Sequence, residues 1–476
     1  MLMRKIIYYL LLFYFVIAIL TIIFFNGTAD SGDSVYYYLF AKYAPDHPEL
    51  FFDQWAKPVF VLLTAPFAQF GFTGLKVFNV IVTAITIFLT YKTAETIKIK
   101  NPILVAVIMI FTPLYYILTF SGLTEPLFAL FLVVSLYLAV KQKYITVCLV
   151  LSFLPFVRSE GLIIIGVFGI FFLVKKQWKL LPYLFVGSVV YSIAGYFVYH
   201  DLLWVFTKIP YAKLSNQYGS GTPFHFVVQL FYVVGIPIYL LFWVGVIAII
   251  FKSIKRKIIL EERILIFLGF FCFFIAHSLF WYFGIFNSMG LKRVLICVMP
   301  MIAIIALDGF NFLTEDVFKE KRIPKLLIQG VLVAYILIFP FTHNPAAVLW
   351  KRDMMLSKEQ QSAIAAANFT REKMKAGSRV LCSNPYLCML LDIDCFEGHK
   401  RLGMSLKDIG QMKAGDFVLW ESWFAVVESN IRKDDLDKNA SLVRIYDSQT
   451  NDEGREVVYS VYQKYENTIL PIPLKN

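Results

Sequence analysis

The sequence contains few charged residues. Asp, Glu, Lys and Arg make up 16% of its 476 residues, whereas 59% of the residues are hydrophobic. Soluble globular chains carry about 25% charged residues, so this composition excludes a cytosolic enzyme and a disordered chain. Six cysteines are too few for a disulfide-rich secreted fold of this length. The mean hydropathy of +0.67 instead predicts an integral membrane protein with many spans.

The common signatures of nucleotide and metal sites are also missing. The chain has no P-loop, no G-x-G-x-x-G motif after a strand, no H-E-x-x-H motif and no Cys/His spacing typical of zinc. Its six histidines are scattered along the chain. The sequence therefore predicts no nucleotide site and no zinc site, and it leaves carboxylates as the remaining ligands for a divalent cation.

Apolar runs recur along the first 342 residues, and we expect eleven of them to cross the membrane. A helix needs about 20 apolar residues to cross roughly 30 Å of hydrocarbon. No A-x-A-like cleavage pattern follows the first run, so we interpret it as a retained span rather than a signal peptide. The expected spans lie at residues 6–25, 74–91, 102–120, 123–140, 144–157, 161–174, 180–199, 226–251, 264–283, 293–310 and 326–342.

The basic residues predict the orientation of these spans. With the N-terminus in the cytoplasm, nineteen of the 27 Lys and Arg residues before residue 343 lie in cytoplasmic segments and eight lie outside. This distribution follows the positive-inside rule. An odd number of spans then places the C-terminus on the extracytoplasmic side of the cell membrane. Since the basic excess orients the spans, the net charge of +12 does not predict a nucleic-acid partner.

Residues 343–476 are predicted to form a small extracytoplasmic α/β domain. A helical pattern at residues 357–377 is followed by four strand-like runs, SRVLCS, GDFVLWESWF, SLVRIYD and REVVYSVYQKY. Cys382, Cys388 and Cys395 lie in this domain. An extracytoplasmic location allows one disulfide among them, but their number and spacing do not identify the pair.

The first extracytoplasmic loop, from Asn26 to about Gly74, carries a candidate site. It places Asp30 and Asp33 just after the first span and continues into SVYYYLFAKY, an aromatic amphipathic segment suited to the membrane interface. Asp33 is a candidate acid or base. An aspartate before an apolar helix is also a common helix cap, so the sequence leaves both roles open.

Charged residues at the outer ends of later spans form a second candidate site. Glu125 opens the fourth span, and Arg158 and Glu160 interrupt FLPFVRSEGLIII. Lys292 and Arg293 precede the tenth span. Each has a structural alternative, as a surface residue, as an interface anchor or, for Arg158, as a partner of Glu160. Together they predict a phosphate-binding face, because guanidinium groups match the geometry of phosphate oxygens.

The order of several segments resembles the C-type (GT-C) membrane glycosyltransferases. These segments are GDSVYYYLFAKY, AKPVFVLLTAPFAQFG, SGLTEPLFALFLVVSLYL, FLPFVRSEG, YGSGTPFHF and LKRVLICVMP. They are most similar to the polyprenyl-phosphate-sugar-dependent enzymes of the dolichyl-phosphate-mannose mannosyltransferase and ArnT-like group. The pieces TEPLFAL and VRSEG are also similar to mannosyltransferases of glycosylphosphatidylinositol assembly. The resemblance covers most of residues 1–310.

This resemblance implies an all-α, GT-C-like membrane part with interfacial helices and an acidic catalytic residue in the first outside loop. It assigns that role to Asp33, with Ser34 at the position of the family's usual second acid. The donor phosphate is implied to contact Arg158, Lys292 and Arg293. Contacts with the rest of the substrates are implied for Asp30, Tyr37, Lys57, Glu125 and Glu160.

The implied activity is transfer of a sugar, mannose-like or related, from a polyprenyl-phosphate donor to an extracytoplasmic lipid, glycan or protein. One base and one in-line attack predict inversion at the anomeric carbon. The carboxylates of Asp30 and Asp33 could bind a divalent cation, and the sequence does not decide whether they do. The alternative function is a non-enzymatic transporter or lipid flippase, which many spans also suit. Transporters tend to contain internal repeats, and we find none here.

Overall fold

The chain forms two compact units in a computed structural model that describes residues 2–210, 218–256, 263–317, 322–342, 350, 354–397, 404–452 and 454–466. The first, here the helical unit, comprises Met1–Phe24 and Pro48–Arg352. The second, here the mixed unit, comprises Phe25–His47 and Asp353–Asn476. Residue 343, where the sequence predicts the domain boundary, lies outside the described residues. The mixed unit contains part of the first outside loop in addition to the C-terminal residues.

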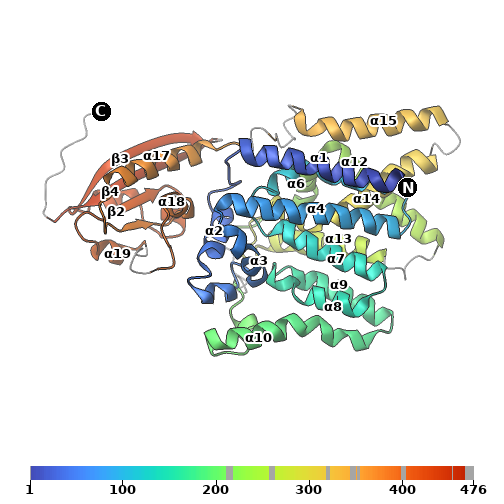
Figure 1. Ribbon diagram of the computed structural model, residues 1–476, viewed down its shortest axis with the longest axis horizontal. Coiled ribbons are helices and arrows are strands. Elements are labelled where there is room, and N and C mark those ends of the chain that lie inside the picture. The colour runs from blue at the N-terminus through green and yellow to red at the C-terminus, as the bar shows by residue number, and fades with distance from the viewer. Residues whose placement is uncertain are drawn as a thin grey trace. The chain divides into compact units, whose positions relative to one another are not determined.

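The helical unit consists of long apolar helices joined by short turns and 3-10 segments. Figure 1 shows the long helices running roughly parallel to one another. In chain order its elements are α1 (Leu2–Phe24), η1 (Pro48–Phe52), α3 (Pro58–Ala68), α4 (Phe72–Thr96), α5 (Leu104–Ile110), α6 (Pro113–Leu118), α7 (Glu125–Val140), α8 (Tyr144–Ser152), η2 (Leu154–Phe156), α9 (Gly161–Val174), η3 (Trp178–Phe185), α10 (Val186–Tyr199), α11 (Trp204–Thr207), α12 (His225–Arg256), α13 (Ile264–Phe283), η5 (Lys292–Val298), α14 (Met299–Asn311), η6 (Phe312–Val317), α15 (Arg322–Ile338) and η7 (Phe339–Phe341).

Every expected span coincides with helical structure, but not all are long uninterrupted helices. Within the described residues, seven helical stretches are long and apolar enough to cross a membrane. The expected spans at 123–140, 144–157 and 161–174 correspond to shorter apolar helices. The expected span at 102–120 is divided between α5 and α6, because Pro113 lacks the N–H that would continue the helix. The prediction of a polytopic, all-α membrane protein is confirmed.

The helices differ in how far their surfaces are covered by protein. The apolar window in Lys292–Val317, which contains α14, is fully buried, whereas 22% of the window in α1 and 17% of that in Ile323–Phe341 is buried. Many apolar side chains of α1, α10 and α15 remain exposed. An apolar helix that protein leaves uncovered is stable when lipid covers it. We therefore assign α14 to the core of the bundle and α1, α10 and α15 to its lipid-facing surface.

Two glycines allow α12 and α14 to approach closely. A Cβ atom added at Gly309 would lie 1.9 Å from the carbonyl oxygen of Leu241, and one added at Gly245 would lie 1.9 Å from that of Ile305. Small residues at such crossings are common between membrane helices. We expect Gly309→Ala to separate the helices and lower the unfolding temperature of the detergent-solubilised protein by several degrees. Gly330→Ala on α15 is the matched control, because nothing lies within 4 Å of its added Cβ. Equal unfolding temperatures for the two variants would contradict this packing.

The mixed unit is built around a four-stranded sheet in the order β1-β2-β4-β3. Strands β1 and β2 are parallel, and the remaining pairs are antiparallel. Its elements are α2 (Asp33–Tyr43), α17 (Lys358–Lys373), β1 (Val380–Cys382), α18 (Pro385–Leu391), α19 (Leu406–Gly410), β2 (Phe417–Glu421), α20 (Phe424–Val427), α21 (Lys433–Asp437), β3 (Leu442–Asp452) and β4 (Arg455–Lys464). The helix and the four strands predicted from the sequence are all present, which confirms the small α/β fold.

The mixed unit has its own apolar core and a buried pair of cysteine sulfurs. Side chains such as Leu381, Val418 and Trp420 form the core beneath the sheet. The Sγ atoms of Cys382 and Cys388 lie 3.0 Å apart. This core explains why the mixed unit forms a compact body.

Candidate active site

Five of the predicted site residues form one connected group in the helical unit, here the charge cluster: Lys57, Glu125, Arg158, Glu160 and Arg293. Arg158 lies at its centre, with Nη1 2.9 Å from Glu125 Oε1 and Nη2 2.9 Å from Glu160 Oε1. The Nε atom of Arg293 lies 3.3 Å from the same Glu125 oxygen. Two guanidinium groups therefore share one carboxylate.

Lys57 joins the charge cluster through Ser159. Its Nζ atom donates hydrogen bonds to the carbonyl oxygen of Gln54 at 2.8 Å and to Ser159 Oγ at 2.9 Å. The backbone of Lys57 has φ 69°, in the left-handed region that non-glycine residues rarely adopt. Such strain persists only where surrounding contacts hold it, and it is common at functional sites.

Helix ends position the acidic members of the charge cluster. Glu125 is the first residue of α7, where the positive end of the helix dipole favours a carboxylate. Glu160 occupies the N-cap position of α9, and Arg158 lies in the turn before it. Arg293 lies on η5, which leads into α14. The cluster is thus formed where helix starts meet, far apart in the sequence.

The charge cluster carries an excess positive charge. Its three cationic groups and two carboxylates leave one positive charge, and Glu125 is fully buried. Burial alone would raise the pKa of Glu160, but Arg158 lowers it to about 2, so this carboxylate is ionised at neutral pH. Burial lowers the pKa of Lys57 to about 8, although Glu160 opposes the change. An anion entering this site would be attracted, since charges interact strongly where water is excluded.

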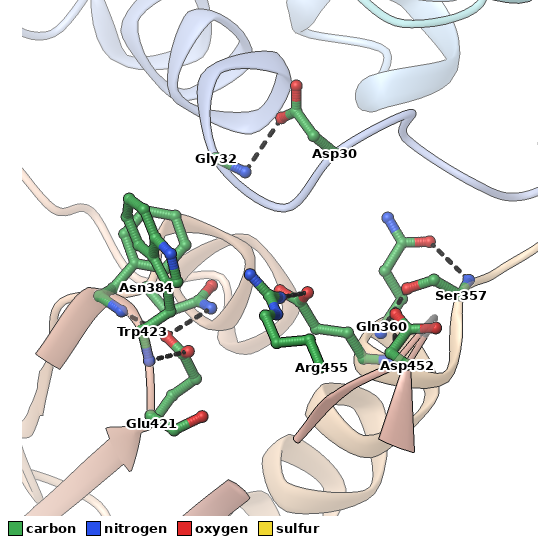
Figure 2. A network of polar contacts seen from close by, with 12 residues as sticks. Asp30, Gly32, Ser357, Gln360, Asn384, Glu421, Trp423, Asp452 and Arg455 are labelled. Atoms are coloured by element: carbon green, nitrogen blue, oxygen red, sulfur yellow. Dashed lines mark hydrogen bonds and ion pairs between the residues drawn. The ribbon is translucent and has the colours of Figure 1, made fainter. Parts of the chain in front are cut away.

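The second group of predicted residues, Asp30, Asp33 and Tyr37, belongs to the mixed unit. Asp30 supplies the cap of α2: its Oδ1 atom accepts hydrogen bonds from the backbone N–H groups of Gly32 and Ser34, each at 3.0 Å. Figure 2 shows Asp30 with its bond to Gly32. Asp33 is the first residue of α2 and partly exposed, and Tyr37 is buried in the same helix. Asp30, three residues earlier, therefore provides the capping role that the sequence had left open for Asp33.

Arg158, Lys292 and Thr124 complete the surroundings of the charge cluster. Arg158 has the ion pair with Glu160 that the structural alternative proposed, and it also pairs with Glu125. Lys292 is partly exposed on η5 beside Arg293. Thr124, whose hydroxyl accepts a hydrogen bond from Arg158 at 3.0 Å, was not predicted. Its position next to Glu125 in the sequence was the available signal, and Ser159 has the same relation to Arg158.

Among the residues that the structure describes, no group of three or more His, Cys, Asp and Glu side chains is arranged to hold a metal ion. A divalent cation held by carboxylates such as Asp30 and Asp33 stays a proposal, which adding Mg²⁺, Mn²⁺ or EDTA to the transfer reaction tests.

Solved structures with the same fold exist despite very low sequence identity. The crystal structure of ArnT from Cupriavidus metallidurans bound to undecaprenyl phosphate aligns with a TM-score of 0.60 at 11% identity, covering 94% of this chain and 97% of that chain. The same protein in the apo state aligns with a TM-score of 0.57 at 10% identity and the same coverage. No known protein family and no curated protein matches the sequence. The chain has the ArnT fold, and the predicted GT-C-like fold class is confirmed.

Proposed function

We propose that this chain is an integral-membrane glycosyltransferase that transfers a sugar from a polyprenyl-phosphate donor to an extracytoplasmic lipid, glycan or protein. The observation that carries the proposal is the fold, which is shared over 94% of the chain with a protein whose structure holds undecaprenyl phosphate. The charge cluster and the orientation expected from the basic residues support the same function. The sugar, mannose-like or related, is part of the proposal.

The charge cluster suits the donor phosphate. In this reaction the bond between the anomeric carbon and a phosphate oxygen breaks, and the polyprenyl phosphate leaves with additional negative charge. Fixed cations placed before the reaction stabilise such charge without reorganisation. Arg293 and Lys292 extend the cationic part of the site along η5, while Arg158 holds both carboxylates. Because the leaving phosphate is a weak base, no general acid is required for its departure.

Asp33 is the proposed general base. Its carboxylate would take the proton from an acceptor hydroxyl as the oxygen attacks the anomeric carbon from the face opposite the phosphate, which inverts the configuration. The base must be accessible to the acceptor, and Asp33 is partly exposed at the start of α2. Since Asp30 supplies the capping hydrogen bonds, the Asp33 carboxylate is not required to cap this helix.

The proposal is tested in two steps. Mass spectrometry of lipids and surface glycans from cells with and without the gene identifies the sugar that is lost. The purified protein in liposomes is then supplied with the corresponding polyprenyl-phosphate sugar and with the acceptor, and glycosidic product is measured. Product formation that depends on the protein is expected. Movement of the lipid across the bilayer without any glycosidic product would overturn the proposal in favour of a flippase. Parallel reactions with EDTA, Mg²⁺ and Mn²⁺ test the divalent cation.

The protonation of Lys57 predicts how turnover depends on pH. Its pKa of about 8 means that the amine is positive below that pH and loses its charge as the pH rises through it. The excess positive charge of the cluster is then lost, so kcat/KM for the donor is expected to fall on the alkaline side. Lys57→Arg keeps the charge at higher pH, because arginine is not deprotonated in proteins, and should move the decline upward. Lys57→Met should be slow at every pH, and an unchanged profile in Lys57→Arg would contradict this role.

A further inference from the structure

The segment that carries Asp30 and Asp33 is attached to the C-terminal domain along its whole length. Near its end, His47 Nε2 lies 2.8 Å from Asp394 Oδ2, and the ring of Phe396 packs 4.7 Å from that of Phe40. Lys42 pairs with Asp392. All of these contacts lie within the mixed unit. Helix α2 is thereby held at its C-terminal half by the residues that follow α18.

The N-terminal end of the segment is held by a relay of hydrogen bonds from α17. Gln360 Nε2 donates to Thr28 Oγ1 at 2.8 Å, and Thr28 Oγ1 donates in turn to the carbonyl oxygen of Asp30 at 2.7 Å. Gln360 and Thr28 are both buried. Because Asp30 in turn caps α2 through Gly32 and Ser34, the relay connects α17 to the first turn of the helix that begins at Asp33.

The backbone between these anchors is strained. Ala29, which separates Thr28 from Asp30, has φ 71°, where a side chain is rarely accommodated. Such a conformation is unfavourable for a residue with a side chain and persists only when neighbouring contacts enforce it. A hydrogen bond between Ser31 and Glu359, the residue before Gln360, adds a further link from the same end of α17. Figure 2 shows Gln360 and Ser357 at this end of the helix.

We infer that the C-terminal part of the mixed unit positions the proposed general base, with Gln360 as a positioning residue that acts through Thr28 to set the place of Asp33. The inference rests on the proposed function and deepens it. The domain then contributes to turnover even where it does not touch a substrate, because a general base displaced from its reacting hydroxyl loses much of its effect.

Gln360→Glu tests the relay while preserving the helix start. Gln360 also forms a capping box with Ser357, accepting a hydrogen bond from Ser357 N at 3.3 Å, and glutamate performs this role equally well. The new carboxylate has no proton to donate to Thr28 Oγ1. The Thr28 hydroxyl must then either donate its proton to this carboxylate and lose its hydrogen bond to the Asp30 carbonyl oxygen, or keep that bond and leave two oxygen atoms in contact without a proton between them. We expect kcat to fall between about 10- and 100-fold, with KM for the donor unchanged.

The matched control is Gln361→Glu, which adds the same charge one residue further on an exposed side chain. It should keep kcat within a factor of about two of the wild type, as surface changes usually do.

Hydrogen–deuterium exchange provides a readout independent of activity. The amides of residues 28–36 should exchange faster in Gln360→Glu than in the wild type, and the amides of the sheet should exchange at the same rate in both. Equal kcat for Gln360→Glu and wild type, or an equal loss in both glutamate variants, would overturn the inference.

Thr28 variants decide the question if Gln360→Glu does not fold. Thr28→Ser retains the hydroxyl and should retain turnover, whereas Thr28→Val keeps the shape, removes the hydroxyl and should lose turnover. Similar rates for the two would overturn the inference. Asp33→Asn is measured in parallel: full turnover there shows that the proposed base is wrong, while the exchange of residues 28–36 still reports on the relay by itself.

Discussion

Asp33→Asn is expected to lower kcat by about 10²- to 10⁴-fold, the usual contribution of a general base. The variant keeps the size of the side chain and removes its ability to accept the proton of an attacking hydroxyl. Helix α2 should still form, because its capping oxygen comes from Asp30. The measurement is turnover of the polyprenyl-phosphate sugar by protein in liposomes, with KM for the donor determined in the same series.

Asp46→Asn is the control for this prediction. Asp46 is exposed and lies in the same segment as Asp33, so the variant removes an equal charge without removing the proposed base. It should show wild-type turnover. Both proteins should remain folded, which their unfolding temperatures will check. Wild-type kcat in Asp33→Asn would rule out Asp33 as the base and leave the fold assignment untouched.

Arg158→Met is expected to have the largest effect on stability. The guanidinium group is the shared partner of Glu125 and Glu160, and its side chain is 14% exposed. Removing one member of a buried ion pair commonly destabilises a protein by about 3 to 5 kcal/mol, because the remaining charge is left uncompensated. The yield of monodisperse protein and its unfolding temperature in detergent are therefore expected to fall sharply.

Neutralising Glu160 separates the structural role of Arg158 from its role in catalysis. In the double variant Arg158→Met/Glu160→Gln no carboxylate is left without a cationic partner, because Glu125 keeps its ion pair with Arg293. Folding should therefore be largely restored. Turnover should remain low, because a cation of the proposed phosphate-binding face is missing. Recovery of both stability and turnover would show that Arg158 only compensates the carboxylates beside it. Failure to recover stability would show that the ion pairs do not account for the loss.

The helical content was predictable because a membrane span is a local property of the sequence. In lipid, the backbone N–H and C=O groups of each apolar run must form hydrogen bonds with one another, so each run forms a helix whatever its neighbours are. Each run therefore located helical structure, although α3 (Pro58–Ala68) lies outside every expected span. Length could not be predicted equally well: the break at Pro113 divides one expected span, and the helices at 123–140, 144–157 and 161–174 are shorter than a full span.

The candidate site was predictable only as a set of residues. The charged residues at the outer ends of the spans could be identified from the sequence, because a charge within lipid is costly and charged residues are therefore rare in and beside membrane spans. Their pairing was not visible, because Glu125, Arg158 and Arg293 come from three different parts of the chain. Gln360 and Thr28 carried no signal at all, since an isolated glutamine and threonine are ordinary residues in a soluble helix and a loop.

The sequence by itself determined that this chain lies in a membrane, that its helices end in charged residues on one predicted face and that a small α/β domain follows. These properties depend on composition and on local periodicity. Only the tertiary structure decided that Asp30 rather than Asp33 caps α2, that two arginines share Glu125, and that the segment with Asp33 is bound to the C-terminal domain. Those features depend on contacts between residues distant in the chain, which no local pattern records.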